Sequence, residues 1–174
     1  MTEPKTSPNT RFYAWMSVAS LVVIVDLVTK WAITEWVTLY EKIPLNSFIN
    51  LTHQRNTGAA FSFLAEAGGW QRWFFVVLAT AVSGAIGVWL WRIRDEGQAL
   101  LAAGLALVLG GAIGNLIDRI AFGYVTDFIQ VKFAGVPFFD PFPAFNIADA
   151  GISVGAALLI IDALFFSGRE ETKG

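Results

Sequence analysis

The stretch that decides the fold is WFFVVLATAVSGAIGVWLW, residues 73–91, which contains no charged side chain. A second uncharged stretch, ALLAAGLALVLGGAIGNLI, follows at residues 99–117. A helix needs about 20 apolar residues to cross the hydrocarbon core of a bilayer, and each stretch supplies nearly that length. The whole chain is 55% hydrophobic and 15% charged, whereas soluble domains carry about 25% charged residues. The sequence therefore predicts an integral membrane protein.

Two further apolar segments complete the pattern. One contains Asp26 and Lys30, and the other lies near the C-terminus. A cleaved signal peptide is the competing interpretation of the first segment, but its apolar run continues past both charges, and no A-x-A cleavage pattern follows. We expect an all-α membrane protein, a four-transmembrane-helix bundle, built as one membrane-embedded domain over residues 1–174. The expected helices cover about 12–37, 70–91, 98–120 and 147–166.

The connecting segments differ in length and composition. Residues 92–97 are short and charged, so the second and third helices are expected to form a hairpin. Within the long loop 38–69, residues 43–63 combine β-forming and polar residues and predict a small β element at the surface. In the other long loop, 121–146, glycine and proline interrupt residues 122–145 too often for a helix. Residues 1–11 are polar and predict a short disordered tail.

Positive charges near the helix ends predict the orientation, because short cytoplasmic loops are enriched in Lys and Arg. One side carries its cations densely on short segments: Lys5, Arg11, Arg92, Arg94, Arg169 and Lys173. The other side carries its cations on the two long loops: Lys42, Arg55, Arg72 and Lys132. We therefore expect both termini to be cytoplasmic and both long loops to lie outside, where they can build one site together.

The composition excludes several kinds of chemistry. The chain contains no cysteine, which excludes disulfides, thiolate metal sites and thiol nucleophiles. It contains one histidine, His53, so a histidine-based metal site or a serine–histidine triad is not expected. Its 12 Lys and Arg residues are scattered rather than gathered in a stripe, so we expect no nucleic-acid partner. Carboxylates remain as the catalytic groups.

Polar groups inside an apolar helix are costly, so each needs an explanation. Asp26 and Lys30 are four residues apart and share a helix face, where they can pair. We favour a structural ion pair over a role in contacting substrate. In the third helix, Asn115, Asp118 and Arg119 follow one another at three- and four-residue spacing and are expected to project from one face. The adjacent Asp118 and Arg119 point about 100° apart, so they are not expected to form a facing pair. All three could act in helix packing and membrane anchoring or in function.

Two further carboxylates lie where the third helix leaves the membrane and the fourth enters it. Asp127 follows the third helix by a few residues, and Asp149 belongs to the first turn of the fourth, so both should reach one depth near the membrane boundary. Two small-residue pairs, Gly110 with Gly114 and Gly151 with Gly155, would let these helices pack closely. Tight packing would bring Asp149 toward the chain around Asp127.

Two adjacent carboxylates can activate water without a metal. They cannot both ionise, so they share a proton and their pKa values split. The ionised partner takes a proton from water, and the protonated partner donates one to a peptide carbonyl. Simpler explanations stay open from spacing alone: Asp149 can merely complement the helix dipole, and Asp127 can be a solvated loop residue.

These residues fall within motifs that resemble the bacterial lipoprotein signal peptidases, also called signal peptidase II. The resemblance runs along nearly the whole chain. Its motifs, in order, are Asp26-Leu27-Val28-Thr29-Lys30, Asn56-Thr57-Gly58-Ala59-Ala60-Phe61, the glycines, Asn115, Asp118 and Arg119 of the third helix, Gly123-Tyr124-Val125-Thr126-Asp127-Phe128, and Phe145-Asn146-Ile147-Ala148-Asp149. Any one motif is weak, but five in this order are specific.

The resemblance implies an aspartyl endopeptidase of the bacterial inner membrane that cleaves prolipoproteins on the N-terminal side of a diacylglyceryl-modified cysteine. It implies Asp127 and Asp149 as catalytic residues, no metal or organic cofactor, inhibition by globomycin, and a small extracytoplasmic β-cradle near residues 43–63. Residues implied to bind substrate or support the aspartates are Asn56, Gly58, Asn115, Arg119 and Asn146. The expected partners are prolipoproteins and membrane lipid, and we expect the chain to act as a monomer.

Two other functions compete with the peptidase. A proton-coupled carrier would use Asp26, Lys30, Asp118 and Asp149 as relay groups, but these charges gather at one membrane boundary instead of crossing it. A purely structural membrane protein leaves the polar motifs unexplained. A peptidase cleaves its substrate in detergent, whereas a carrier needs a sealed membrane.

Overall fold

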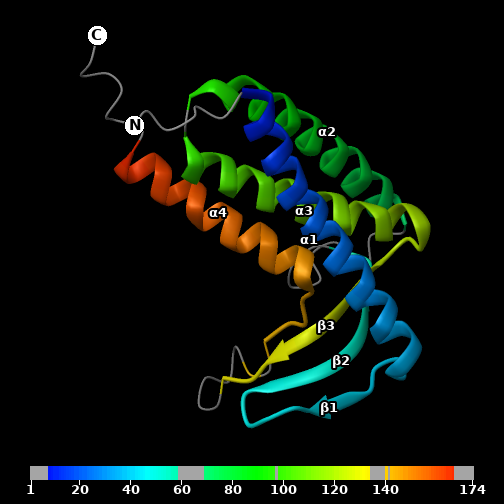
Figure 1. Ribbon diagram of the computed structural model, residues 1–174. Helices are drawn as coiled ribbons and strands as arrows, with labels where there is room; N and C mark the ends of the chain where they lie inside the picture. Colours follow the sequence, from blue (N-terminus) through cyan, green and yellow to red (C-terminus); the bar gives the residue numbers. More distant parts are fainter. Residues whose placement is uncertain (1–7, 59–68, 97, 134–139, 141, 167–174) are drawn as a thin grey trace.

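The computed structural model describes residues 8–58, 69–96, 98–133, 140 and 142–166. Within these residues, four helices are long and apolar enough to cross a membrane (Figure 1). A short 3₁₀ turn, η2, links the second helix to the third. The bounds are α1 Pro8–Trp36, α2 Trp70–Arg92, η2 Ile93–Asp95, α3 Ala99–Ala121 and α4 Ile147–Phe165.

The sequence places three of these helices to within one residue at each end, and the exception is the start of α1. Residues 8–11 were expected in a disordered tail, but the helix already begins at Pro8. Proline is favourable in the first turn of a helix, because the N–H that it lacks has no helical acceptor there and its fixed φ suits a helix. The rest of the expected tail, residues 1–7, lies outside the described residues.

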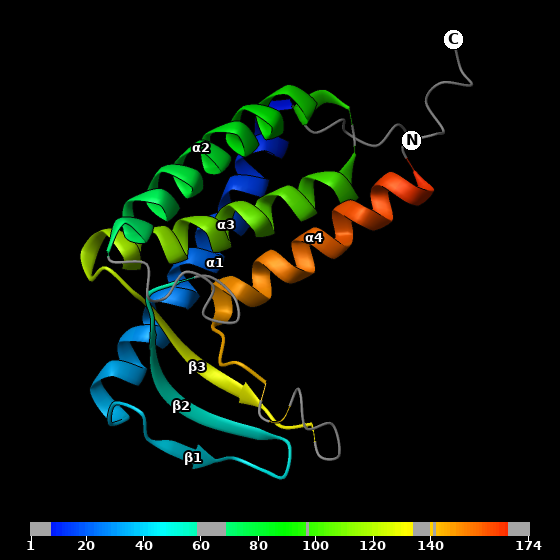
Figure 2. The same ribbon diagram turned by 180° about the vertical axis from the view of Figure 1, so that it is seen from behind.

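Helix α3 occupies the middle of the bundle, packed against α1, α2 and α4 (Figures 1 and 2). The apolar core lies between α1, α2 and α3 and includes Ala19, Leu90, Leu105, Ala106 and Leu109, each at most 2% exposed. The backbones of α1 and α2 each run alongside α3 for longer than alongside one another, so α3 sets the place of both.

The glycines of α3 face two different helices, which corrects one expectation. Gly110 and Gly114 were expected to match the glycines of α4, but a Cβ on Gly110 would lie 2.6 Å from the Ala19 carbonyl oxygen of α1. The face toward α4 carries Gly104, where a Cβ would lie 3.0 Å from the Gly155 carbonyl oxygen. Spacing alone identified small residues but not their direction, because glycine occurs on both faces of this helix.

A small antiparallel sheet lies at one end of the bundle (Figure 1). Its strands in the described residues are β1 Lys42–Pro44, β2 Ile49–Asn56 and β3 Val125–Val131, in the order β1–β2–β3. The β element predicted at residues 43–63 therefore exists, and its last part, residues 59–63, lies outside the described residues. The sheet joins both long loops, because β2 belongs to one and β3 to the other.

Strand β3 is the element that the sequence did not reveal. The loop around it was expected not to be helical. None of its described residues from 122 to 145 lies in a helix, and seven of them form a strand. Their burial does not alternate, since Val125, Thr126, Asp127 and Phe128 are all buried. A strand covered on both faces has no polar–apolar alternation to reveal it, and the nearby glycines and prolines hid its β-branched residues.

The sheet is fixed to the bundle by a second apolar cluster. Ile33 and Val37 at the end of α1 pack against Phe128 of β3, and Ile147 at the start of α4 joins them. The buried contact holds β3 beside the first turn of α4 and brings residues from the two long loops to one end of the helices.

Candidate active site

Asp127 is the third residue of β3, the last strand in the order β1–β2–β3, and is only 3% exposed. On β3 it faces Gln54 of β2, next to a break in the β2–β3 register between Leu51 and Gln54. A register break of this kind bends a strand and redirects its side chains. The alternative interpretation of Asp127 as a solvated loop residue is wrong, because the residue is buried and belongs to a strand.

Asp149 occupies the third position of α4 and belongs to a capping box with Asn146. The Asp149 N–H donates to Asn146 Oδ1 at 2.9 Å, and the Asn146 N–H donates to Asp149 Oδ2 at 3.3 Å. A capping box satisfies backbone donors that a helix start leaves free. Asp149 therefore does complement the helix terminus, as its simpler explanation holds, but the capping box uses only its Oδ2.

Asn146 connects the two carboxylates directly. Its backbone N–H holds Asp149, and its side-chain Nδ2 donates to Asp127 Oδ1 at 2.8 Å. The residue is fully buried, so water does not compete with these bonds. The expectation that Asp127 and Asp149 reach one depth agrees with this shared partner.

Asn115 of α3 supports the same pair from the bundle side. Its Nδ2 donates to Asp149 Oδ1 at 2.7 Å, and its Oδ1 accepts from Lys30 Nζ at 2.9 Å and from Asn146 Nδ2 at 3.2 Å. An ammonium group only donates hydrogen bonds, so it fixes which end of the Asn115 amide is the oxygen. The NH₂ end must then face Asp149.

Asn56, Gly58 and Arg119 line the side of the site formed by the first long loop. Asn56 Nδ2 donates to Asp127 Oδ2 at 3.0 Å. Arg119 Nη2 donates to the Gly58 carbonyl oxygen at 3.0 Å, and its guanidinium lies 5.0 Å from the centre of the Phe75 ring. The residues Ala59–Phe61 of the same motif lie outside the described part of the chain. The structure thus brings together all the residues that the resemblance implied.

The predicted Asp26–Lys30 pair is present, with 2.7 Å between Lys30 Nζ and Asp26 Oδ2. It has a partner that the sequence did not assign, since Asp118 Oδ2 lies 3.2 Å from the same ammonium group. Asp118 therefore faces α1, whereas Arg119 turns toward Gly58. Asn115 lies three residues before Asp118 and four before Arg119 on one broad face of α3, and the adjacent Asp118 and Arg119 point apart, as the sequence predicts.

Burial, and next the negative charge of Asp149, raises the pKa of Asp127 from 3.8 to about 7. Hydrogen bonds from Asn56 and Asn146 oppose this shift by stabilising the carboxylate. Desolvation disfavours the charged form, and so does a like charge nearby. Asp127 can therefore hold a proton near neutral pH and release it there, as a general acid requires.

Arg72 of α2 supports the end of α3, a role that the sequence did not predict. Its Nε donates to the Arg119 carbonyl oxygen at 2.9 Å, and its Nη2 donates to that of Ile120 at 2.8 Å. These carbonyls end α3, where a cation is favourable. The sequence feature that could have revealed this role is the position of Arg72, two residues after the start of an apolar helix and at the same membrane boundary as the other polar motifs.

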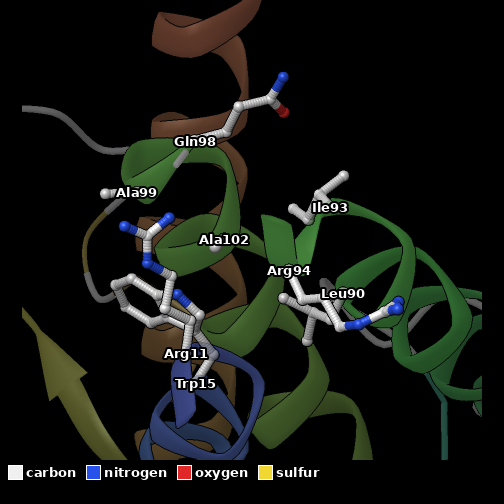
Figure 3. Close-up of a pocket in the computed structure, with 8 residues that line it drawn as sticks. All are labelled: Arg11, Trp15, Leu90, Ile93, Arg94, Gln98, Ala99 and Ala102. Carbon is white, nitrogen blue, oxygen red and sulfur yellow. The ribbon is translucent and has the colours of Figure 1, made fainter. Parts of the chain in front are cut away.

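A cavity of about 220 Å³ lies at the other end of the helices (Figure 3). It contains no carboxylate among its lining residues, so it does not compete with the site above: Arg11, Trp15, Leu90, Ile93, Arg94, Gln98, Ala99 and Ala102. Among the described residues, no group of three or more His, Cys, Asp or Glu side chains is arranged to hold a metal ion.

The sequence of this chain is similar to those of known signal peptidases. The profile described as signal peptidase (SPase) II matches residues 18–165. The chain is 48% identical to a lipoprotein signal peptidase of Cupriavidus pinatubonensis, over 92% of this chain and 88% of the relative. It is 46% identical to a lipoprotein signal peptidase of Pseudomonas putida, over 91% of this chain and 90% of that one.

The fold has solved counterparts as well. A bacterial membrane enzyme solved at 2.3 Å shares 32% sequence identity and superimposes with a TM-score of 0.76, over 87% of each chain. A second bacterial membrane enzyme, solved at 1.9 Å, shares 30% identity with a TM-score of 0.74, over 88% of this chain and 94% of the other. With a profile match that spans most of the sequence and relatives matched over most of their length, the chain belongs to the signal peptidase II family.

Proposed function

We propose that this protein is an aspartyl endopeptidase that removes signal peptides from prolipoproteins, cleaving on the N-terminal side of a diacylglyceryl-modified cysteine. The observation that carries the proposal is the shared asparagine. Asn146 donates to Asp127 through its side chain and to Asp149 through its backbone. A pair of carboxylates held in this way can divide the acid and base roles of peptide hydrolysis.

The reaction assigns one role to each aspartate. Asp127 serves as the proton donor, since burial and the charge of Asp149 raise its pKa to about 7 and a large fraction of the molecules hold its proton at neutral pH. Ionised Asp149 takes a proton from a water molecule, whose oxygen attacks the scissile carbonyl carbon while Asp127 protonates the carbonyl oxygen. Collapse of the tetrahedral intermediate breaks the C–N bond: one of its hydroxyl groups returns a proton to Asp127, and the proton held by Asp149 goes to the leaving nitrogen. The products are a signal peptide with a new carboxyl end and a lipoprotein with a free amino group on its modified cysteine.

Asn56, Gly58 and Arg119 form the proposed substrate side of the site. Arg119 contacts the Gly58 carbonyl in the resting protein, and the negative charge of Asp149 attracts its guanidinium. A planar guanidinium can grip two oxygens at once, so Arg119 suits a peptide carbonyl or an ester oxygen of the diacylglyceryl group. Asn56 keeps Asp127 oriented from the same side.

The proposed orientation places both termini in the cytoplasm and the site near the outer face of the membrane. The start of α1, the end of α4 and η2 lie at the end of the bundle away from the sheet (Figure 2), which fits the Lys and Arg distribution. The chain contains no cysteine, so single cysteines give clean probes. Ser47→Cys should react with an impermeant thiol reagent in whole cells, and Asp95→Cys should not. The reverse labelling pattern would overturn the orientation.

The test of the activity uses purified protein in detergent and two synthetic peptides that differ only in the diacylglyceryl group on cysteine. We expect cleavage of the modified peptide before the cysteine, no cleavage of the unmodified one, and inhibition by globomycin at the same site. Asp127→Asn and Asp149→Asn should each abolish turnover but leave binding of the modified peptide intact. Cleavage by either variant at near wild-type rate would overturn the mechanism. Light scattering of the active detergent complex tests our expectation of a monomer.

A further inference from the structure

We infer that Lys30, Asp26 and Asp118 are positioning residues that hold the two catalytic aspartates at their working separation. These three residues are called the charged frame below. The inference rests on the proposed Asp127–Asp149 dyad and deepens it, because it assigns a role in catalysis to a buried ion pair that was expected to be structural.

Each carboxylate of the charged frame holds the backbone directly before one catalytic aspartate. Asp26 Oδ1 accepts from the Ala148 N–H at 2.9 Å, one residue before Asp149. Asp118 Oδ2 accepts from the Thr126 N–H at 3.0 Å, one residue before Asp127. Since each bond holds the residue that precedes an aspartate of the dyad, a shift of either carboxylate would displace the backbone that carries the aspartate.

Lys30 joins these two anchors. Its Nζ lies 2.7 Å from Asp26 Oδ2 and 3.2 Å from Asp118 Oδ2, and it also donates to Asn115 Oδ1 at 2.9 Å. These contacts match the three N–H donors of an ammonium group. Lys30 is 3% exposed, Asp26 fully buried and Asp118 2% exposed, so the distance between the two backbone anchors depends on the cation between them.

Lys30 acts on the dyad by a second route, through the amide of Asn115. Because the ammonium group only donates, Asn115 must present its oxygen to Lys30 and its NH₂ to Asp149, as observed at 2.7 Å. Without the cation, the amide can rotate and place its oxygen against Asp149. The same residue thus sets both the position of Asp149 and the donor that it meets.

The packing around the charged frame leaves little freedom. A Cβ on Gly114 would lie 2.6 Å from Asp26 Oδ2, so α1 and α3 meet here without a side chain between them. Burying charges costs desolvation energy, and well-packed apolar residues of similar volume often give equal or greater stability. Stability is therefore a weak explanation for this cluster, and the contacts with residues 126 and 148 supply a stronger one.

The test removes all the charges of the frame together, so that none is left buried and unpaired. The triple variant Asp26→Asn, Lys30→Met, Asp118→Asn retains an oxygen for the Ala148 and Thr126 N–H groups but no donor for Asn115. We expect folded protein with kcat for the diacylglyceryl-cysteine peptide lowered about 100-fold, the usual scale for misplacing a reacting group by about 1 Å. KM should stay within about threefold, since substrate contacts are unchanged.

Two comparisons complete the experiment. Asp26→Asn and Asp118→Asn alone keep Lys30 and should lower kcat less than about 10-fold, and Lys42→Met, an exposed lysine of β1, should leave both constants unchanged. Near wild-type kcat in the triple variant would overturn the inference.

If the triple variant does not fold, Lys30→Gln replaces it and should show the same loss of kcat. Failure of Lys30→Gln to fold as well would assign Lys30 to folding and overturn its role in positioning. Asp127→Asn is measured in parallel: activity there would contradict the dyad, whereas activity in the triple variant alone contradicts only the charged frame.

Discussion

Helices α2 and α3 are nearly equal in length and hydropathy, the two measures that predict membrane insertion, yet α3 is largely buried inside the protein and α2 is largely exposed. Each has 23 residues, and their most apolar windows have mean hydropathies of 2.0 and 2.1. Only 11% of the window in α2 is buried inside the protein, against 56% of that in α3. Hydropathy therefore predicts that a helix enters the membrane and says nothing of what it will contact there.

The glycines and polar residues explain the difference. A Cβ added to Gly84 or Gly87 of α2 would meet nothing within 4 Å, whereas one added to Gly111 of α3 would collide with the Ala148 carbonyl oxygen of α4. In membranes, small residues let helix backbones approach closely. The polar residues Asn115 and Asp118 lie on that same packed helix and are buried. The proposed site therefore uses residues of the helix that packs tightly against its neighbours.

The largest expected effect on stability belongs to Asp127, in the strand that packs near the end of α3. Its pKa is 3.8 unfolded and about 7 folded, so the folded protein holds an extra proton between these values. This contribution to stability is fully present below pH 3.8 and is lost as the pH rises through about 7, a change of about 4 kcal/mol. The asparagine of Asp127→Asn does not titrate, so the stability of this variant lacks that loss at high pH. The variant gives up one accepted hydrogen bond, worth about 1 kcal/mol.

We therefore expect Asp127→Asn to be more stable than the wild type by about 3 kcal/mol above pH 7 and less stable by about 1 kcal/mol below pH 3.8, where the lost hydrogen bond alone remains. Thermal unfolding in detergent across this pH range measures it. An equal pH dependence in both proteins would show that burial of Asp127 costs nothing.

Gly111→Ala should have the next largest effect. Its Cβ meets the backbone of Ala148, next to Asp149, and backbone moves less readily than a flexible side chain. Overpacking of this kind costs about 1–3 kcal/mol, and displacement of Asp149 should lower kcat about 100-fold. Thermal unfolding and peptide cleavage measure the two effects. A fully active, equally stable variant would break the comparison between α2 and α3.

Arg119→Lys should have a smaller effect, confined to activity. Lysine keeps the charge but loses the planar group that donates to Gly58 and lies over Phe75. We expect kcat/KM to fall about 10-fold, equivalent to about 1.4 kcal/mol, with little change in the melting temperature. Steady-state kinetics on the lipid-modified peptide measure this change in kcat/KM. Unchanged kinetics would reduce Arg119 to a membrane anchor.

Gly84→Ala is the matched partner of Gly111→Ala and should have the smallest effect. The added methyl group meets open space, and alanine favours a helix interior over glycine by up to about 1 kcal/mol. The variant should be as active as the wild type and slightly more stable. A clear loss of activity would indicate that this face of α2 has a partner.

How far the sequence predicts this structure depends on whether the signal is local. Asp26 and Lys30 could be paired in advance because both lie on one helix, four residues apart. Asp118 could not be added to them, because its contact with Lys30 depends on how α1 and α3 pack. Strand β3 was hidden because both its faces are buried, and the directions of Gly104 and Gly110 depend on helix neighbours that spacing does not identify. Motif resemblance supplied the site residues, and tertiary contacts gave them their partners.

The central claim is that Asp127 and Asp149 act as one coupled pair, and the titration of Asp127 tests it most directly. Carboxyl carbon-13 NMR on protein labelled at aspartate, with Asp127→Asn used to assign the signal, would follow its protonation in the wild type and in Asp149→Asn. We predict a midpoint near pH 7 in the wild type, and a lower one in the variant, because removing the charge of Asp149 leaves only burial to raise the pKa. A wild-type midpoint near 3.8, or one unchanged by Asp149→Asn, would contradict the coupled dyad.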